Sequence, residues 1–223
     1  MTKLILIISL WLLSISSFSQ TLFDIFLKLP EHVAIETISK RKQMIARYIE
    51  GEQYVDTKKR IYLYLDVVDH RNGYMSYAGA YEGTWSMCYW NLENDTKLVA
   101  VLCVGCGPLC VVESFDFFTY DGTELKPYRQ PVIENIKIEH FFSLSNEEFI
   151  MMNQKYDLPL GLVFELPRYD KNIVANIYTE CNHEGSDYTN FLKPKQLGNT
   201  IILQFQQDGS FKKTDPYWDK KRR

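Results

Sequence analysis

Three cysteines lie close enough along the chain to share chemistry. Cys103, Cys106 and Cys110 occur within eight residues of one another, in an otherwise apolar run with two glycines and a proline. In the cytosol this spacing would indicate a metal or redox site, whereas in an oxidising compartment it indicates a disulfide. The interpretation of these cysteines therefore depends on where the chain is located.

The first 19 residues predict export. Lys3 precedes an apolar run of about a dozen residues, and Ser17-Phe18-Ser19 follows as a small-x-small cleavage pattern. The run is shorter than the roughly 20 residues that a membrane-spanning helix needs. A buried N-terminal helix is the alternative. We predict a signal peptide over residues 1–19, cleaved near Ser19-Gln20, and an exported mature chain, periplasmic or extracellular, with no transmembrane segment.

Export favours a disulfide between Cys106 and Cys110. Gly107 and Pro108 stand between these cysteines and form a strong turn signal. A turn there brings the two cysteines face to face across the mouth of a hairpin, within the distance that a disulfide requires. Such a bridge closes a very short loop, so we expect it to fix a turn rather than to hold the whole fold together.

Cys88 and Cys103 form a second candidate pair. They lie opposite each other if residues 94–97 form the loop between their two strands. Both cysteines occur in apolar runs, so two buried thiols are an equal alternative. Cys181 remains as the odd cysteine, either free and buried or bonded to another chain.

Redox and metal chemistry are the less favoured interpretations of the cysteine cluster. Cys103 and Cys106 match a C-x-x-C pattern, but a reactive pair needs a helix N-terminus beside it, and here a strand pattern follows. A zinc site could combine the cluster with Cys88, or with Cys181 and His183. Export and the lack of a second C-x-x-C count against zinc. We therefore expect no metal and no cofactor.

No motif of a known catalytic class occurs elsewhere. The sequence lacks the nucleophile elbow, phosphate-binding and dinucleotide-binding patterns, and its histidines have no metal-binding spacing. The adjacent Glu147 and Glu148 are explained by the start of a helix, where acidic side chains are favoured. A hydrolase that uses two carboxylates stays open, because the distance between carboxylates is not visible in a sequence.

Aromatic residues supply a candidate binding surface. Five of them crowd the second and third predicted strands, namely Tyr77, Tyr81, Trp85, Tyr89 and Trp90. Tyrosine and tryptophan dominate binding hot spots, and they also stack on sugars. The alternative is ordinary packing in the core.

Composition and charge restrict the class of protein. Apolar residues make up 46% of the chain and aromatic residues 14%, which is enough for a real core. The net charge is −3 with both signs mixed, which disfavours nucleic-acid binding. The one basic block lies in the tail over residues 216–223, where we expect a solvated terminus.

The hydrophobic periodicity predicts an α+β protein dominated by antiparallel strands. Residues 20–58 have helical spacing. Residues 59–138 contain short strand patterns separated by turns about ten residues apart, which favours a meander or a sandwich. Residues 139–215 begin with a capping box at Ser145, which predicts a helix near 145–155, and continue with a second set of strands. A duplication that relates the two β-rich halves is one interpretation, and similar architecture without common origin is the alternative, since no run of identity links them.

The central motifs resemble those of a family of uncharacterised exported bacterial proteins. The residues that carry the resemblance are Asn72-Gly73-Tyr74, Gly105-Cys106-Gly107-Pro108-Leu109-Cys110 and Tyr156-Asp157-Leu158-Pro159. They extend over roughly residues 60 to 165. The resemblance implies an envelope or periplasmic location and a strand-borne Gly-Cys-Gly-Pro-x-Cys element. It implies no reaction.

These observations favour an exported, non-catalytic binding or envelope-associated protein, whose partner is an envelope protein or a glycan. One alternative is a periplasmic or secreted hydrolase with carboxylates that the sequence does not place. Another is an inhibitor or immunity-type protein.

Overall fold

The computed structural model describes residues 21–51, 63–79, 83–107, 109–156, 160–179 and 185–220. The predicted signal peptide, Tyr81, Cys181 and His183 lie outside these ranges. Within them, none of the helices has both the length and the apolar character that crossing a membrane requires.

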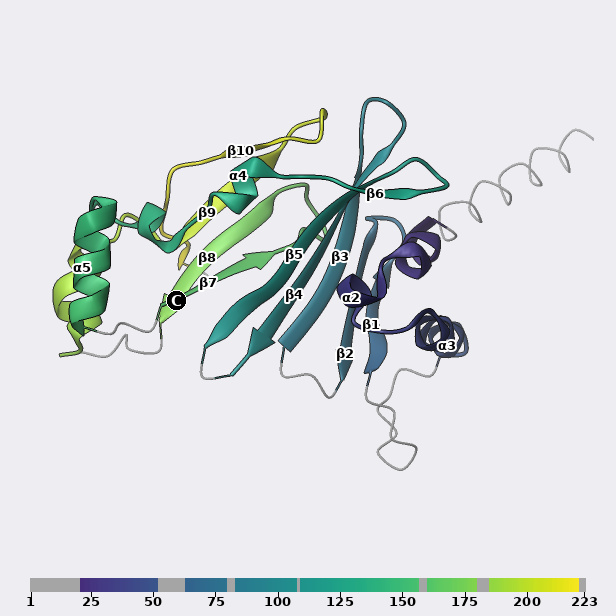
Figure 1. Ribbon diagram of the computed structural model, residues 1–223, viewed down its shortest axis with the longest axis horizontal. Helices are drawn as coiled ribbons and strands as arrows, with labels where there is room; N and C mark the ends of the chain where they lie inside the picture. Colours follow the sequence, from purple (N-terminus) through teal and green to yellow (C-terminus); the bar gives the residue numbers. More distant parts are fainter. Residues whose placement is uncertain are drawn as a thin grey trace, which may run out of the picture.

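The chain forms two antiparallel sheets, as the periodicity predicts (Figure 1). The first sheet is a six-stranded meander in chain order, made of β1 (Leu63–Asp69), β2 (Tyr74–Gly79), β3 (Gly83–Asn91), β4 (Lys97–Cys106), β5 (Cys110–Tyr120) and β6 (Leu125–Pro127). The second sheet has four strands in the order β10-β9-β8-β7, made of β7 (Leu160–Glu165), β8 (Ile173–Thr179), β9 (Thr200–Phe205) and β10 (Phe211–Lys213).

Helices cover one face of the first sheet, and the second sheet covers the other (Figure 1). The helical layer consists of residues 21–28, α2 (Glu31–Ala34) and α3 (Ile38–Ile49). Thr37 caps α3, since its side chain accepts a hydrogen bond from the amide of Lys40. The layer order is thus helices, six-stranded sheet, four-stranded sheet.

Two separate cores result from this layering, and β4 belongs to both. Odd-numbered residues of β4, such as Val99 and Val101, pack toward the helices, while Leu98, Ala100 and Leu102 pack toward the second sheet. All the residues from Leu98 to Val104 are buried. A strand buried on both faces loses the alternation of apolar and polar residues, which explains its continuous apolar sequence.

The two sheets are connected through short helices. After β6 come α4 (Pro131–Glu134), the 3-10 turn η1 (Ile138–Phe141) and α5 (Asn146–Tyr156). The capping box predicted for α5 is present: the amide of Glu148 donates to Ser145 Oγ, and the amide of Ser145 donates to Glu148 Oε2. A π-turn, η2 (Tyr188–Leu192), and a 3-10 turn, η3 (Lys193–Lys195), precede β9.

Candidate functional site

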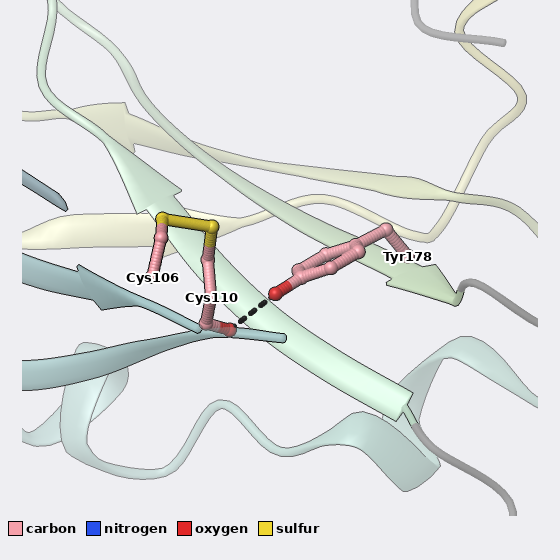
Figure 2. The surroundings of a disulfide bond; sticks show 3 residues. All are labelled: Cys106, Cys110 and Tyr178. Carbon is pink, nitrogen blue, oxygen red and sulfur yellow. Dashed lines mark hydrogen bonds between the residues drawn. A yellow bond between two sulfur atoms is a disulfide. The ribbon is translucent and has the colours of Figure 1, made fainter. Parts of the chain in front are cut away.

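A disulfide joins Cys106 and Cys110 at the turn of the β4–β5 hairpin (Figure 2). The Cα atoms of the two cysteines lie 3.9 Å apart. The hydroxyl of Tyr178, on β8, donates a hydrogen bond to the carbonyl oxygen of Cys110. Gly161 lies under the Tyr178 ring, where a Cβ atom would be 2.4 Å from the ring carbons. The bridged turn is therefore fastened to the second sheet.

Of the two alternatives for Cys88 and Cys103, the disulfide is excluded and the other is confirmed, because both thiols are free and buried. The loop between β3 and β4 contains residues 92–96, so that Cys88 lies opposite Ala100 and Cys103 opposite Trp85. This register places the two thiols on opposite faces of the sheet, in different cores. A bridge between them is thus sterically excluded.

The two free thiols are also poorly suited to redox chemistry. Burial raises the pKa of Cys88. Burial and the neighbouring carboxylate of Glu113 raise the pKa of Cys103 to about 12. Cys103 packs among the residues of the helical side, whereas Cys106 packs toward the second sheet. The C-x-x-C spacing therefore does not create a redox pair.

Tyr77 and Trp85 do not form an exposed aromatic face, which corrects the expectation from sequence. Their rings stack with centroids 4.5 Å apart and are buried under the helical layer. The Tyr77 hydroxyl donates to the carbonyl of Ala34, and the Trp85 indole N–H donates to that of Val33, each over 3.0 Å. The two aromatic residues thus satisfy carbonyl groups at the end of α2 that the helix leaves unpaired.

Trp90 and Tyr89 are also engaged within the protein. Trp90 is buried between the sheets, stacks on Phe205 and donates its indole N–H to the carbonyl of Lys171 over 2.9 Å. The Tyr89 ring is half-buried, with Gly73 against it and the Lys97 ammonium 4.9 Å from its centroid. The four predicted aromatic residues within the described ranges therefore act mainly in packing.

A groove of about 610 Å³ runs along the outer edge of β5, and we call it the β5 groove. One wall is formed by His32 and Val33 of the helical layer, and another by Tyr128 and Ile133 of the connecting segment. Between them lie Phe115–Phe118 of β5. The second sheet contributes Phe164 of β7. Phe115 and Phe117 point to one face of the sheet, and Asp116 and Phe118 to the other. The groove therefore follows the strand edge itself.

The edge of β5 is open where β6 leaves it. The amide of Tyr128 donates the last hydrogen bond, to the carbonyl of Phe117 over 2.8 Å, and Pro131 then begins α4 at its first position. Gln130 fixes this departure, since its side-chain amide donates to the carbonyl of Gly209. Among the described residues, no strand other than β4 and β6 pairs with β5.

Phe115 presents backbone groups to the β5 groove. Alternate residues of a strand direct their backbone N–H and C=O groups to the same side. The backbone groups of Phe115 therefore point away from β4, as those of Phe117 do. The register shift at Glu113 is a β-bulge, which disturbs pairing nearer the disulfide. The regular part of the open edge is therefore the stretch from Ser114 to Asp116.

Two carboxylates of the described residues line the β5 groove, and one of them is held in an ion pair. The two are Asp116 and Glu134. The Arg129 guanidinium, hydrogen-bonded to Glu134 at 2.5 Å, lowers the pKa of that carboxyl, so it is ionised at neutral pH and cannot act as a general acid. Within the described ranges, no group of three potential metal ligands occurs.

The sequence contained only a weak signal for this groove. The run Phe115–Phe118 has the pattern of any buried strand, and residues 127–138 contain two prolines, so neither segment indicates a groove. In the structure those prolines end β6 and start α4, and this departure opens the strand edge.

Comparison with known proteins identifies a similar fold and no function. No protein-family model matches this chain, and no curated protein matches it. A solved structure of a domain of an uncharacterized protein from Porphyromonas gingivalis W83 superposes with a TM-score of 0.62 and 14% sequence identity, over 86% of this chain and 97% of that one. At this identity the likeness shows the fold alone.

Proposed function

We propose that this chain is an exported, non-catalytic binding protein whose β5 groove takes an extended segment of an envelope protein. The observation that carries the proposal is the open backbone edge at Phe115, at the bottom of a groove with aromatic walls. An extended peptide can add a strand to such an edge, with main-chain hydrogen bonds for affinity and side-chain pockets for specificity.

The dimensions and chemistry of the groove suit this ligand. Its volume lies within the range of roughly 300–1,000 Å³ that is typical of ligand sites. Phe115 and the exposed Tyr128 offer apolar surface to an aromatic or aliphatic anchor, whereas Phe117 and Phe164 line the groove with little exposed area. Asp116 is the one carboxylate there without an arginine partner among the described residues, so a basic residue beside the anchor is favoured.

Export is supported by two independent features. The N-terminal 19 residues have the pattern of a signal peptide. The Cys106–Cys110 disulfide is typical of an oxidising compartment. We therefore place the partner in the cell envelope.

Selection from a random nine-residue peptide display library on the folded mature protein tests the proposal. We expect enrichment of sequences with an apolar anchor and a basic residue. Asp116→Lys and Tyr128→Ser should each weaken the selected peptide about tenfold. Ile150→Ser, an exposed apolar position on α5, is the matched control and should change nothing.

Amide hydrogen exchange gives a second measurement on the same complex. The amide of Phe115 should exchange more slowly with the peptide bound, because strand addition gives it a hydrogen-bond acceptor. Failure to enrich any peptide, or peptides whose affinity is unchanged by both groove variants, would contradict the proposal.

A further inference from the structure

A second opening lies between two turns at the end of the sheets opposite the disulfide. We call it the turn cleft, and its volume is about 290 Å³. The β1–β2 turn contributes Arg71 and Asn72, β3 contributes Asn91, and the loop between β7 and β8 contributes Tyr169, Asp170 and Lys171. The cleft is therefore built from both sheets and is separate from the β5 groove.

Hydrogen bonds hold the walls of the turn cleft in place. Asp69 accepts from the backbone amide of Asn72 at 3.1 Å and from its side-chain amide at 3.0 Å, which fixes the first turn. Arg168 Nε donates to the same carboxylate over 3.1 Å, so the second loop is tied to the first. The indole N–H of Trp90 donates a hydrogen bond to the backbone carbonyl of Lys171. A site with fixed walls loses little entropy on binding.

Positive charge is concentrated at the turn cleft, although the protein as a whole has a net charge of −3. Among the described residues, the side chains of Arg71 and Lys171 have no ion-pair or hydrogen-bond partner. The ammonium group of Lys97 donates a hydrogen bond to the neutral Oδ1 of Asn91, a lining residue, at 2.6 Å. Asp170 is the only carboxylate among the described residues that line the cleft. Uncompensated cations in a concave site attract an anion.

An exposed aromatic ring stands beside these cations. Tyr169 is 78% exposed, and the guanidinium of Arg168 lies 4.9 Å from its ring centroid. A tyrosine held in place on one side can pack its other, electron-rich face against the C–H groups of a pyranose ring. Asn72 and Asn91 also line the cleft, and the Oδ1 of Asn72 and the Nδ2 of Asn91, which their contacts with Asp69 and Lys97 do not use, are suited to sugar hydroxyls.

We propose that the turn cleft binds a saccharide that carries a carboxylate or sulfate group. Arg71 and Lys171 contact the anionic group, and Tyr169 packs against the sugar ring. The small volume limits the bound part to one or two sugar units.

Titration calorimetry with the folded mature protein tests this site. The probes are trigalacturonate, its methyl ester, a chondroitin sulfate tetrasaccharide and sodium sulfate. We expect both acidic saccharides to bind at least about tenfold more tightly than the uncharged ester, since a hydrogen bond to a charged group is worth about 1.5–3 kcal/mol. Equal affinity for the acid and its ester, or no binding of either acidic saccharide, would overturn the proposal.

Variants identify the residues and separate a saccharide site from a bare anion site. The double variant Arg71→Gln, Lys171→Gln should weaken both acidic saccharides about tenfold, while the control Lys212→Gln, Lys213→Gln on β10 should not. Tyr169→Ala should weaken the saccharides and leave sulfate unchanged. Sulfate that binds as tightly as the saccharides shows an anion site only and refutes the sugar contact. Asp116→Lys, which alters the β5 groove, should have no effect here, so the two proposals fail independently.

Discussion

The Nε atom of Arg168 lies 3.1 Å from Oδ2 of Asp69, and this ion pair joins the two sheets at one end. Asp69 ends β1, and Arg168 lies in the loop before β8. At the other end, Tyr178 donates to the carbonyl of Cys110. The registers of β2 with β3 and of β3 with β4 place the β1–β2 turn and the disulfide at opposite ends of the first sheet. The sheets are thus fastened at both ends.

The Asp69–Arg168 pair should contribute a pH-dependent part of the stability. Burial opposes ionisation of Asp69, but hydrogen bonds from Asn72 and Arg168 outweigh it and lower the pKa of the carboxyl. The contribution is therefore complete above the unfolded-state pKa of about 3.9 and is lost as the pH falls through the folded-state value. At pH 7, Asp69→Asn should lower the thermal midpoint by about 1–3 °C.

Urea unfolding between pH 7 and pH 2.5 measures this effect. The difference between wild type and Asp69→Asn should stay constant above about pH 5 and close in the acid range. Glu93→Gln, at an exposed carboxylate with no ion pair among the described residues, is the control for a general effect of removing a carboxylate. A difference that persists undiminished at pH 2.5 would be incompatible with this explanation.

The indole hydrogen bond of Trp85 should stabilise the packing of the helical layer on the first sheet, and that of Trp90 should not. Trp85→Phe leaves the carbonyl of Val33 without its indole donor, which should cost about 1–3 kcal/mol of unfolding free energy. Amide exchange should accelerate in α2. Trp90→Phe is the matched variant, because its indole donates to Lys171 on the opposite face. Faster exchange in α2 from both variants would show that the role of Trp85 is not specific.

The disulfide should make a modest contribution to stability. The chain-entropy relation gives about 2 kcal/mol for so short a loop. The double variant Cys106→Ser, Cys110→Ser avoids a new free thiol, and its free energy of unfolding from urea titration should be lower by that amount. Reductant should destabilise the wild type to the same level and leave the double variant unchanged. A reductant effect on the double variant would mean that another bridge contributes.

The thiols of Cys88 and Cys103 should be unreactive in the folded protein. Burial raises the pKa of both, and that of Cys103 reaches about 12. At pH 8 we expect iodoacetamide to label neither residue within the time that labels a urea-unfolded sample completely. Peptide mapping by mass spectrometry distinguishes the two sites. Rapid labelling of Cys103 in native protein would exclude the buried position assigned to it.

Local sequence signals predicted the elements well. The second set of strands predicted after the helix is present, and its β8 (Ile173–Thr179) is a run of apolar and β-branched residues. Ser145 and Glu148 predicted α5 because a capping box is a local pattern that no distant residue needs to complete. The α+β class with antiparallel sheets is confirmed for the same reason, since alternation and turns are read within a few residues.

Register and layering could not be predicted, because neither is local. Since β4 is apolar at consecutive positions, its pattern does not say which residue faces which core. A loop assumed to centre on residues 94–97 rather than 92–96 brought Cys88 opposite Cys103 in the prediction, and the real register separates them. Likewise, nothing near Tyr77 and Trp85 in the sequence shows that α2 covers them.

The separation of the two cores sets an order of assembly. Among the described residues, the core under the helices uses those from Leu22 to Leu125, so it can close before the second sheet forms. The core between the sheets requires residues up to Phe211. A chain that folds from its N-terminus therefore passes through a stage in which Leu98, Leu102 and Phe117 form an uncovered apolar face. At that stage the chain needs protection from aggregation, and β7 to β10 supply it when they dock.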